Sequence, residues 1–232
     1  MVDIDPDQLP EGAQKRAQVT SMFDAIAPRY DLVNRIMTFG LDVRWRRATV
    51  RRLGLAPGST IVDLACGTGD FCRDLDRAAL HPVGMDLSMG MLREARTDAP
   101  LVNADVLSLP LPDGGVDGVT CGFALRNFVE LHGFFDELAR VVRPGGRIAL
   151  LEVAEPTNRA LRRGHGIYFG SVVPFIGGVL SDRTAYQYLP KSVAYLPAAP
   201  VLEAAIAEAG FTPVEHTRLS GGIAQLFLAT RR

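Results

Sequence analysis

The ten residues VDLACGTGDF, at positions 62–71, constrain the fold of this chain more than any other segment. A short apolar run ends at Asp63, glycines follow at positions 67 and 69, and a helical pattern begins near Asp70. Glycine lets the backbone turn tightly and approach a ligand, because no Cβ stands in the way. The segment therefore predicts a strand, a ligand-binding loop and a helix whose first N–H groups favour an anionic group.

Short apolar runs and helical patterns alternate along the rest of the chain. We expect strands at residues 59–65, 82–86, 100–105, 117–123, 146–153, 212–219 and 224–230. We expect helices at residues 15–27, 35–39, 43–53, 70–79, 88–95, 131–142 and 200–209. Such alternation predicts parallel strands joined by right-handed crossovers.

The last two predicted strands are joined only by Ser220, Gly221 and Gly222, and so short a link suits an antiparallel hairpin. The predicted fold class is therefore α/β: a doubly wound, seven-stranded, mostly parallel sheet with an antiparallel C-terminal hairpin and N-terminal helices. The Pro144-Gly145-Gly146 sequence is expected to form the turn between the sixth helix and the fifth strand.

The ligand of the glycine loop is indicated by what surrounds the loop. A dinucleotide fingerprint would need a third glycine where Cys72 stands, and no phosphate-binding GK[ST] sequence follows the loop. Asp86 ends the second predicted strand, where its carboxylate can accept both ribose hydroxyls of a nucleoside. S-adenosylmethionine fits this pattern, with its amino-acid head held by Asp63, Gly67 and Gly69. The alternative is an ordinary strand–turn–helix corner without a ligand.

Composition excludes several classes of protein. A chain of 232 residues suits one compact domain, and 25 basic against 26 acidic residues disfavour a nucleic-acid partner. Three cysteines and an acidic, polar start predict a cytoplasmic protein without a disulfide framework. The four histidines are scattered, so no metal site is predicted. We divide the chain into an N-terminal helical cap, 1–54, and a cofactor-binding domain, 55–232, with an apolar insertion near 159–198.

Two further segments have more than one interpretation. The uncharged stretch 164–181 is near the length of a membrane span, but Pro174 and five glycines disfavour a membrane-spanning helix there. Within it, residues 167–180 are densely apolar. We expect instead a lid that binds a greasy ligand, with a core segment or a subunit interface as alternatives. The arginines of residues 44–52, around Trp45, predict a solvated helix face or, alternatively, a surface resting on anionic lipid.

Taken together, the motifs resemble those of a known family. The matching segments are residues 22–47, 63–70, 109–128, 140–152 and 185–193, so the resemblance covers nearly the whole chain. The DLACGTGD and PGG elements resemble class I S-adenosylmethionine-dependent methyltransferases in general. The FD-x-x-A-x-x-YD-x-x-N and F-x-LRN patterns resemble, more narrowly, the UbiE/MenG family of demethylmenaquinone and ubiquinone-precursor C-methyltransferases. The resemblance implies a Rossmann-like fold.

The resemblance also implies an activity and a set of cofactor contacts. It places Thr68 beside the methionine moiety, Asp86 at the ribose, Asp105 and Val106 at the adenine, and Gly122 near the cofactor. It implies methyl transfer to a ring carbon of a prenylated quinol, demethylmenaquinol before other substrates. The alternatives are a ubiquinone precursor, a soluble aromatic natural product, and a cofactor-binding regulatory protein without activity.

Three residues are candidates for the chemistry. Arg126 is expected to stabilise an oxyanion on the substrate, mostly on the resemblance, with a structural ion pair as the alternative. Asn127 is expected to orient a ring oxygen, and Tyr30, beside Asp31, to orient substrate or simply to pack. We also expect peripheral contact with the inner face of the plasma membrane and a homodimer as further partners.

Overall fold

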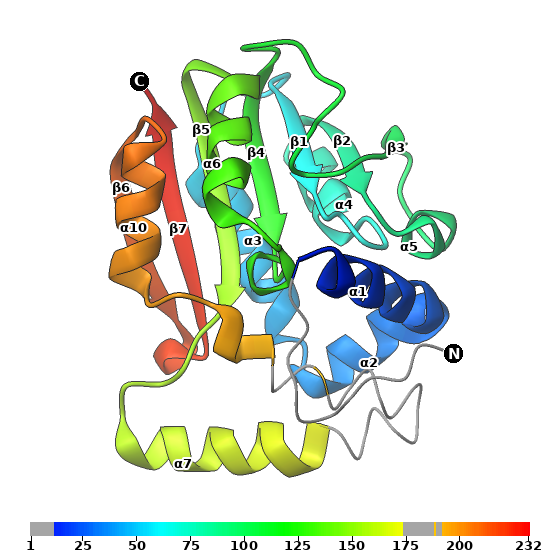
Figure 1. The fold of residues 1–232 in the computed structure, drawn as a ribbon, viewed down its shortest axis with the longest axis vertical. Helices are drawn as coiled ribbons and strands as arrows, with labels where there is room; N and C mark the ends of the chain where they lie inside the picture. Colours follow the sequence, from blue (N-terminus) through cyan, green and yellow to red (C-terminus); the bar gives the residue numbers. More distant parts are fainter. Residues whose placement is uncertain (1–11, 174–187, 189–191) are drawn as a thin grey trace.

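The sheet has the predicted architecture. The computed structural model describes residues 12–173, 188 and 192–232, and within them the strands form one sheet in the order β3-β2-β1-β4-β5-β7-β6 (Figure 1). The strands are β1 (Thr60–Leu64), β2 (His81–Asp86), β3 (Leu101–Asn103), β4 (Val116–Gly122), β5 (Val142–Val153), β6 (Phe211–Leu219) and β7 (Ala224–Arg231). Strands β1 to β5 pair in parallel, whereas β7 runs antiparallel to both β5 and β6. The predicted fold class is confirmed.

Helices cover both faces of the sheet because side chains alternate along each strand. Along β5, Ile148 and Leu150 pack towards α6 (Leu131–Val141) and α10 (Ala199–Glu208). Their neighbours Ala149 and Leu151 pack towards α3 (Leu41–Leu53) and α4 (Asp70–Asp76). The core therefore consists of two apolar layers, one on each face of the sheet.

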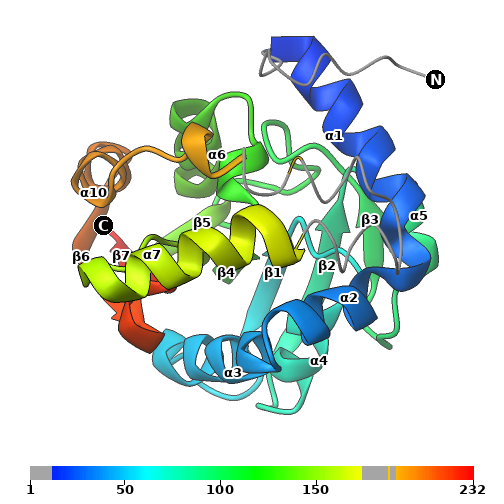
Figure 2. The same ribbon diagram turned by 90° about the horizontal axis from the view of Figure 1, so that it is seen from below.

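A third set of helices lies below the carboxyl ends of the parallel strands in Figure 1, and Figure 2 shows it from below. It consists of α1 (Gly12–Ile26), α2 (Tyr30–Met37), α7 (Arg159–Ile167) and the π-helical segment Tyr168–Val172, with the short α5 (Met89–Arg93) beside α1. A small apolar cluster joins them, with Ile26, Val33, Met37, Met91 and Val173 among its members. We call α1, α2, α7 and residues 168–172 the helical cover.

Two local predictions are wrong. The helix expected at 35–39 is α2, which begins at Tyr30 and ends at Met37, because Phe39 and Gly40 have φ of 51° and 73°, which stops a right-handed helix. The turn expected at Pro144-Gly145-Gly146 lies inside β5: Val142 pairs with Val116 and Arg147 with Gly118, so residues 143–146 bulge out of the ladder. The 3-10 segments are Ala27–Arg29, Leu125–Asn127, Val193–Tyr195 and Ser220–Gly222.

Helix α3 of the N-terminal region packs on the sheet, and the described part of the apolar segment at 167–180 is helical. Trp45, Val50 and Leu53 of α3 pack into the core on the sheet. The proposed boundary between residues 54 and 55 therefore divides the sequence but does not divide the core. Residues 167–173 of the apolar segment are helical, and residues 174–180 lie outside the described part of the chain. No described helix is long and apolar enough to cross a membrane.

The basic stretch around Trp45 forms an amphipathic helix, as the sequence predicts, with Arg44, Arg47 and Arg51 exposed. Trp45 and Arg46 are buried. The Arg46 guanidinium lies 2.7 Å from the carboxylate oxygens of both Asp42 and Asp70, and 3.4 Å from that of Asp74. This arginine therefore ties α3 to α4 and departs from the predicted solvated face, whereas Arg44, Arg47 and Arg51 lie on that face. The lipid-facing alternative stays a prediction.

Candidate active site

The glycine loop has the backbone geometry that its sequence predicts. Between β1 and α4, Gly67 and Gly69 adopt left-handed φ values of 54° and 81°. The Gly67 N–H donates a hydrogen bond to Asp86 Oδ2 at 2.8 Å, and the Ser88 N–H donates one to Asp86 Oδ1 at 2.8 Å. Asp86 thus fastens the loop to the end of β2. Burial raises the pKa of Asp86, and these two backbone donors oppose that shift.

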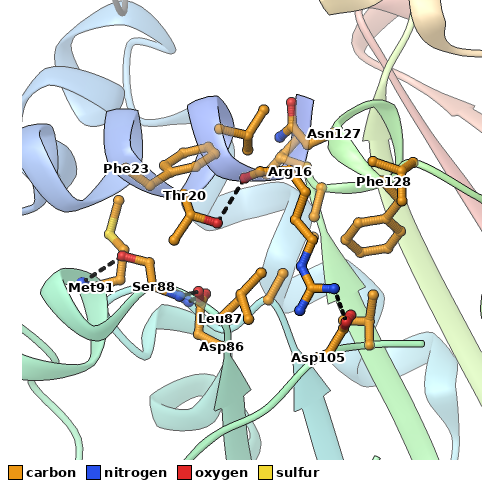
Figure 3. A pocket seen from close by; sticks show the side chains of 18 of the residues that line it. Arg16, Thr20, Phe23, Asp86, Leu87, Ser88, Met91, Asp105, Asn127 and Phe128 are labelled. Carbon is orange, nitrogen blue, oxygen red and sulfur yellow. Dashed lines mark hydrogen bonds and ion pairs between the residues drawn. The ribbon is translucent and has the colours of Figure 1, made fainter. Parts of the chain in front are cut away.

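Asp86 belongs to a small cavity of about 110 Å³ at the carboxyl ends of the strands (Figure 3). The candidate residues that line it are Tyr30, Gly67, Asp86, Asp105, Val106, Gly122 and Asn127. Carboxylate oxygens carry two lone pairs each, so Asp86 can accept from a ligand while it keeps its backbone donors. The structure therefore brings together most of the residues assigned to the cofactor.

Helix α1, part of the N-terminal helical cap that the sequence predicts, closes the small cavity on one side; its contact residues there were not predicted. Arg16, Val19, Thr20 and Phe23 line it, and Arg16 Nη1 lies 2.7 Å from Asp105 Oδ2 (Figure 3). Asp105 therefore forms an ion pair across the cavity. The Asp24 carboxylate binds the other end of α1 to α5, accepting hydrogen bonds from Ser88 Oγ at 2.6 Å and from the Gly90 N–H at 2.7 Å.

A larger cavity of about 410 Å³ adjoins the first. Tyr30, Gly67, Gly122, Phe123 and Asn127 line both cavities, so the two meet at these residues. The larger one also contains Asp63, Thr68 and Arg126, and its walls are mostly apolar. Those apolar walls include Met37, Phe39, Leu41, Trp45, Leu161, Tyr168 and Val173.

Three residues predicted to hold the methionine moiety lie outside the small cavity: Asp63, Thr68 and Gly69. Asp63 is buried and accepts hydrogen bonds from Thr120 Oγ1 at 2.8 Å and from the Cys72 thiol, and burial raises the pKa of Asp63 to about 7. The Thr68 hydroxyl donates a short hydrogen bond to Asp31 of α2. Gly69 lines neither cavity; it caps α4, where a Cβ would lie 2.7 Å from Thr97 Cγ2.

Arg126 lies in the 3-10 turn that follows β4 and is buried. Its Nη1 lies 2.6 Å from Glu152 Oε1 and donates a hydrogen bond to the Phe123 carbonyl at 2.5 Å, and its Nε donates to Ser192 Oγ at 3.1 Å. Glu152, at the end of β5, is fully buried and also accepts from the Arg126 N–H at 3.3 Å. Arg126 is therefore both a member of an ion pair and part of the wall of the larger cavity.

Hydrogen bonds from Tyr188 and from Lys15 of α1 fix the turn that carries Arg126 and Asn127. Asn127 Oδ1 accepts a hydrogen bond from the Tyr188 hydroxyl at 3.5 Å. Lys15 of α1 is buried, and its ammonium donates to the carbonyls of Arg126 at 3.0 Å and Phe128 at 2.9 Å. Burial lowers the pKa of Lys15 to about 8. Helix α1 therefore closes the small cavity and supports the turn that carries Arg126.

Tyr30 stands where the cavities meet. Its ring packs edge-on against Phe23, with 5.9 Å between the ring centroids. Burial raises the pKa of Tyr30, with its hydrogen bond to Asn34 opposing the shift. At neutral pH the phenol is therefore protonated and acts as a hydrogen-bond donor, not as a base.

The sequence favours small apolar fillers, and not nucleophiles, at Cys66 and Cys121. Cys66, Cys72 and Cys121 are all buried, and burial raises the pKa of the Cys121 thiol. A hydrogen bond with Cys72, together with burial, raises the pKa of Cys66. None of the three is therefore a ready nucleophile. Across the described residues, no group of histidine, cysteine and carboxylate side chains could hold a metal ion.

Comparison with known proteins agrees with this geometry. The model of the ubiE/COQ5 methyltransferase family matches residues 11–231. The "Ubiquinone/menaquinone biosynthesis C-methyltransferase UbiE" of Syntrophotalea carbinolica is 42% identical over 221 residues, covering 90% of this chain and 92% of that protein. The "Demethylmenaquinone methyltransferase" of Thermus thermophilus is 43% identical over 221 residues, covering 90% and 100%.

Solved structures share the fold. A Haemonchus contortus phosphoethanolamine N-methyltransferase bound to S-adenosylhomocysteine has a TM-score of 0.59 at 15% identity, covering 80% of this chain and 52% of that one. The [4+2]-cyclase SpnF has a TM-score of 0.67 at 16% identity, covering 97% and 99%. Because one neighbour is a cyclase, the fold alone does not determine the reaction.

Proposed function

Because the chain belongs to the ubiE/COQ5 methyltransferase family, we propose that it transfers a methyl group from S-adenosylmethionine to a ring carbon of a prenylated quinol, converting demethylmenaquinol to menaquinol. The alternatives are a ubiquinone precursor, since other relatives carry both quinones in their names, and a soluble aromatic compound.

The observation that supports the proposal most is the junction of two unlike cavities. The small one presents the Asp86 carboxylate and a glycine-lined backbone, and the larger one presents mostly apolar walls with Arg126 inside. They meet at Tyr30, Gly67 and Asn127. A polar cofactor and a greasy acceptor can therefore occupy adjacent sites, which in-line transfer between two bound reactants requires.

The residues of the small cavity fit the cofactor. A ribose needs a carboxylate with spare lone pairs, which Asp86 offers, and a close backbone approach needs the missing Cβ of Gly67. We assign the ribose to Asp86, the adenine to Asp105 and Val106, and the methionine moiety to Thr68 with the glycine loop; Gly122 and Asp63 complete the set. When bound, S-adenosylmethionine supplies an electrophilic methyl group.

The chain's own residues have separate tasks in the reaction. A ring hydroxyl must lose its proton to water for the ring carbon to become nucleophilic, and the Arg126 guanidinium stabilises the resulting oxyanion. Once the methyl group is transferred, the same ring carbon must lose its hydrogen to water as a proton, which restores the aromatic ring. The guanidinium is fixed in orientation, because Glu152 and the Phe123 carbonyl hold Nη1 and Ser192 holds Nε. Asn127 and the protonated Tyr30 orient the ring oxygens, and α1 covers the small cavity on one side.

An assay with labelled cofactor tests the proposal. Demethylmenaquinol in detergent is expected to become methylated faster than a demethylubiquinol precursor or a tail-free analogue, and NAD is expected not to compete with S-adenosylmethionine. Methylation of the tail-free compound alone would replace the lipid substrate by a soluble one. Cofactor binding without turnover on any of the three would favour the regulatory interpretation.

The remaining partners stay proposals. A prenylated substrate resides in lipid, which supports peripheral contact of this chain with the inner face of the plasma membrane. A homodimer stays a prediction, and size-exclusion chromatography with light scattering measures it directly.

A further inference from the structure

Helix α2 has two apolar faces, and only one of them is buried. Val33 and Met37 pack in the small cluster of the helical cover. Leu32 and Ile36, four residues apart, form a second stripe beside the first, and Phe39 follows two residues after α2 ends at Met37. The exposed fractions of Leu32, Ile36 and Phe39 are 58%, 40% and 78%. So much exposed apolar surface on one element is typical of an interaction site.

The stripe continues onto a segment that is distant in sequence. The Tyr168 hydroxyl donates a hydrogen bond to the Met37 carbonyl at 2.8 Å, and the Tyr168 and Phe39 ring centroids lie 5.6 Å apart. Next to Tyr168, Ile167 is 68% exposed and Val172 is 38% exposed. We call Leu32, Ile36, Phe39, Ile167 and Val172 the apolar rim. Figure 2 shows α2 and α7 on the same side of the molecule.

The apolar rim lies at an opening of the larger cavity. Phe39 and Leu161 line that cavity, yet both are exposed to solvent. The cavity therefore reaches the surface between α2 and α7. A molecule that enters by this opening passes between exposed apolar side chains before it reaches Arg126.

Positive charge surrounds the rim. On α7, Arg159, Arg162 and Arg163 are exposed and recur at spacings of three and four, on the side of the helix opposite Leu161. Arg35 of α2 is half exposed and lies 3.5 Å from Asp70. The carboxylates nearby are Asp31, which accepts from Thr68, and the exposed Glu155. With Arg35 paired to Asp70, the unbalanced charge is that of α7, which carries three arginines and no carboxylate beside Ile167 of the rim. A basic helix next to exposed apolar side chains favours an anionic lipid surface.

We propose that the apolar rim and the α7 arginines dock the protein on the surface of an anionic bilayer. The inference rests on the proposed function, since a prenylated quinol dissolved in the bilayer would then enter the larger cavity without crossing water. A second copy of the chain is the competing occupant of the rim, and the test below separates the two.

The experiment measures sedimentation of the full chain with vesicles of phosphatidylcholine, alone or mixed with phosphatidylglycerol. Wild type is expected to bind the mixed vesicles, and added salt is expected to weaken that binding. The triple variant Leu32→Ser/Ile36→Ser/Ile167→Ser, which spares both cavity linings, is expected to lose about tenfold or more in vesicle affinity, because three apolar side chains no longer enter the lipid. The matched control is Val201→Ser, since Val201 is 55% exposed on α10, and it is expected to bind like wild type.

Charge is tested separately, so that a folding defect of the triple variant does not decide the outcome. Arg159→Gln/Arg163→Gln is expected to reduce binding to phosphatidylglycerol vesicles, while Arg44→Gln/Arg51→Gln on α3 is not. Equal binding by the rim variant and the Val201→Ser control overturns the proposal. A wild-type dimer that the rim variant converts to monomers also overturns it, because the rim would then be a subunit interface. Vesicle binding needs no turnover, whereas failure of the proposed function appears as absent methylation of detergent-dispersed demethylmenaquinol.

Discussion

Two parts of the molecule enclose the cavities: the loops at the carboxyl ends of the parallel strands, which we call the loop edge, and the helical cover. Different interactions stabilise the two. The edge rests on two apolar layers that pack against the sheet, and Asp86 fastens its loop by two backbone N–H donors. The cover rests on a small apolar cluster and on single polar side chains, among them Lys15, Asp24 and Asp31. A substitution at the edge therefore changes cofactor binding or catalysis, whereas one in the cover changes closure and access.

The largest effect, on kcat, is expected for Arg126, the candidate catalytic residue of the loop edge. Arg126→Lys keeps a positive charge beside Glu152 but loses the planar guanidinium, so kcat is expected to fall about 10²–10³-fold. Because Arg126 does not line the small cavity, the affinity for S-adenosylmethionine is expected to stay near that of wild type. Steady-state kinetics and calorimetry measure the two quantities.

The control for that variant is Arg143→Lys, since Arg143 is an exposed arginine paired with Asp117 at 2.5 Å. It is expected to leave kcat unchanged. Near-normal turnover of Arg126→Lys with weakened cofactor binding would make Arg126 a structural residue, which is the alternative that its ion pair supports.

The second effect also concerns the edge. Asp86→Ala removes the carboxylate assigned to the ribose and the acceptor of two loop N–H groups, so cofactor binding is expected to weaken by about 1.5–3 kcal/mol. Calorimetry is the measurement, with Asp113→Ala, an exposed carboxylate, as the control. Unchanged affinity in a folded Asp86→Ala variant would show that Asp86 does not bind the ribose.

The third effect tests the cover as the site of the prenyl tail. Phe169 and Phe175 are the two phenylalanines of the predicted lid, residues 167–180, but neither side chain belongs to the described part of the structure. Phe39 and Leu161 line the larger cavity. Phe39→Ser/Leu161→Ser is expected to raise KM for the prenylated quinol about tenfold, because each lost CH₂ contact weakens binding by up to about 0.8 kcal/mol.

Activity of that variant on a tail-free analogue is expected to remain at the wild-type level. If KM rises equally for both substrates, the larger cavity does not discriminate the tail and the lipid preference lies elsewhere.

The sequence could predict the loop edge better than the helical cover. The strand–loop–helix around Gly67 and the position of Asp86 follow from local patterns, because strand ends and glycine turns depend on neighbouring residues. Burial of Lys15 and the Arg16–Asp105 ion pair depend on where α1 rests, and the weakly amphipathic sequence of α1 carries no sign of either. Glu152 is intermediate: an acid closing the apolar run IALLE was a signal for a buried partner that local reasoning left unused.

The smallest effect concerns the Lys15 ammonium of α1, which joins the helical cover to the turn of Arg126. It is expected as a pH dependence of the free energy of unfolding. Burial lowers the pKa of Lys15 from 10.5 to about 8, so between these values the unfolded chain binds a proton that the folded chain has released. Stability attributable to this group therefore rises with pH across that window and is constant below it. Urea unfolding of wild type and Lys15→Met from pH 7.5 to 10 isolates the group, because other titrations cancel in the difference. We expect the free energy of unfolding of wild type to gain up to about 1 kcal/mol on the variant over that range, with partial solvent contact limiting the size. A difference that stays flat or shrinks as pH rises would mean that the Lys15 ammonium is solvated, and that α1 is not fastened to the Arg126 turn at this point.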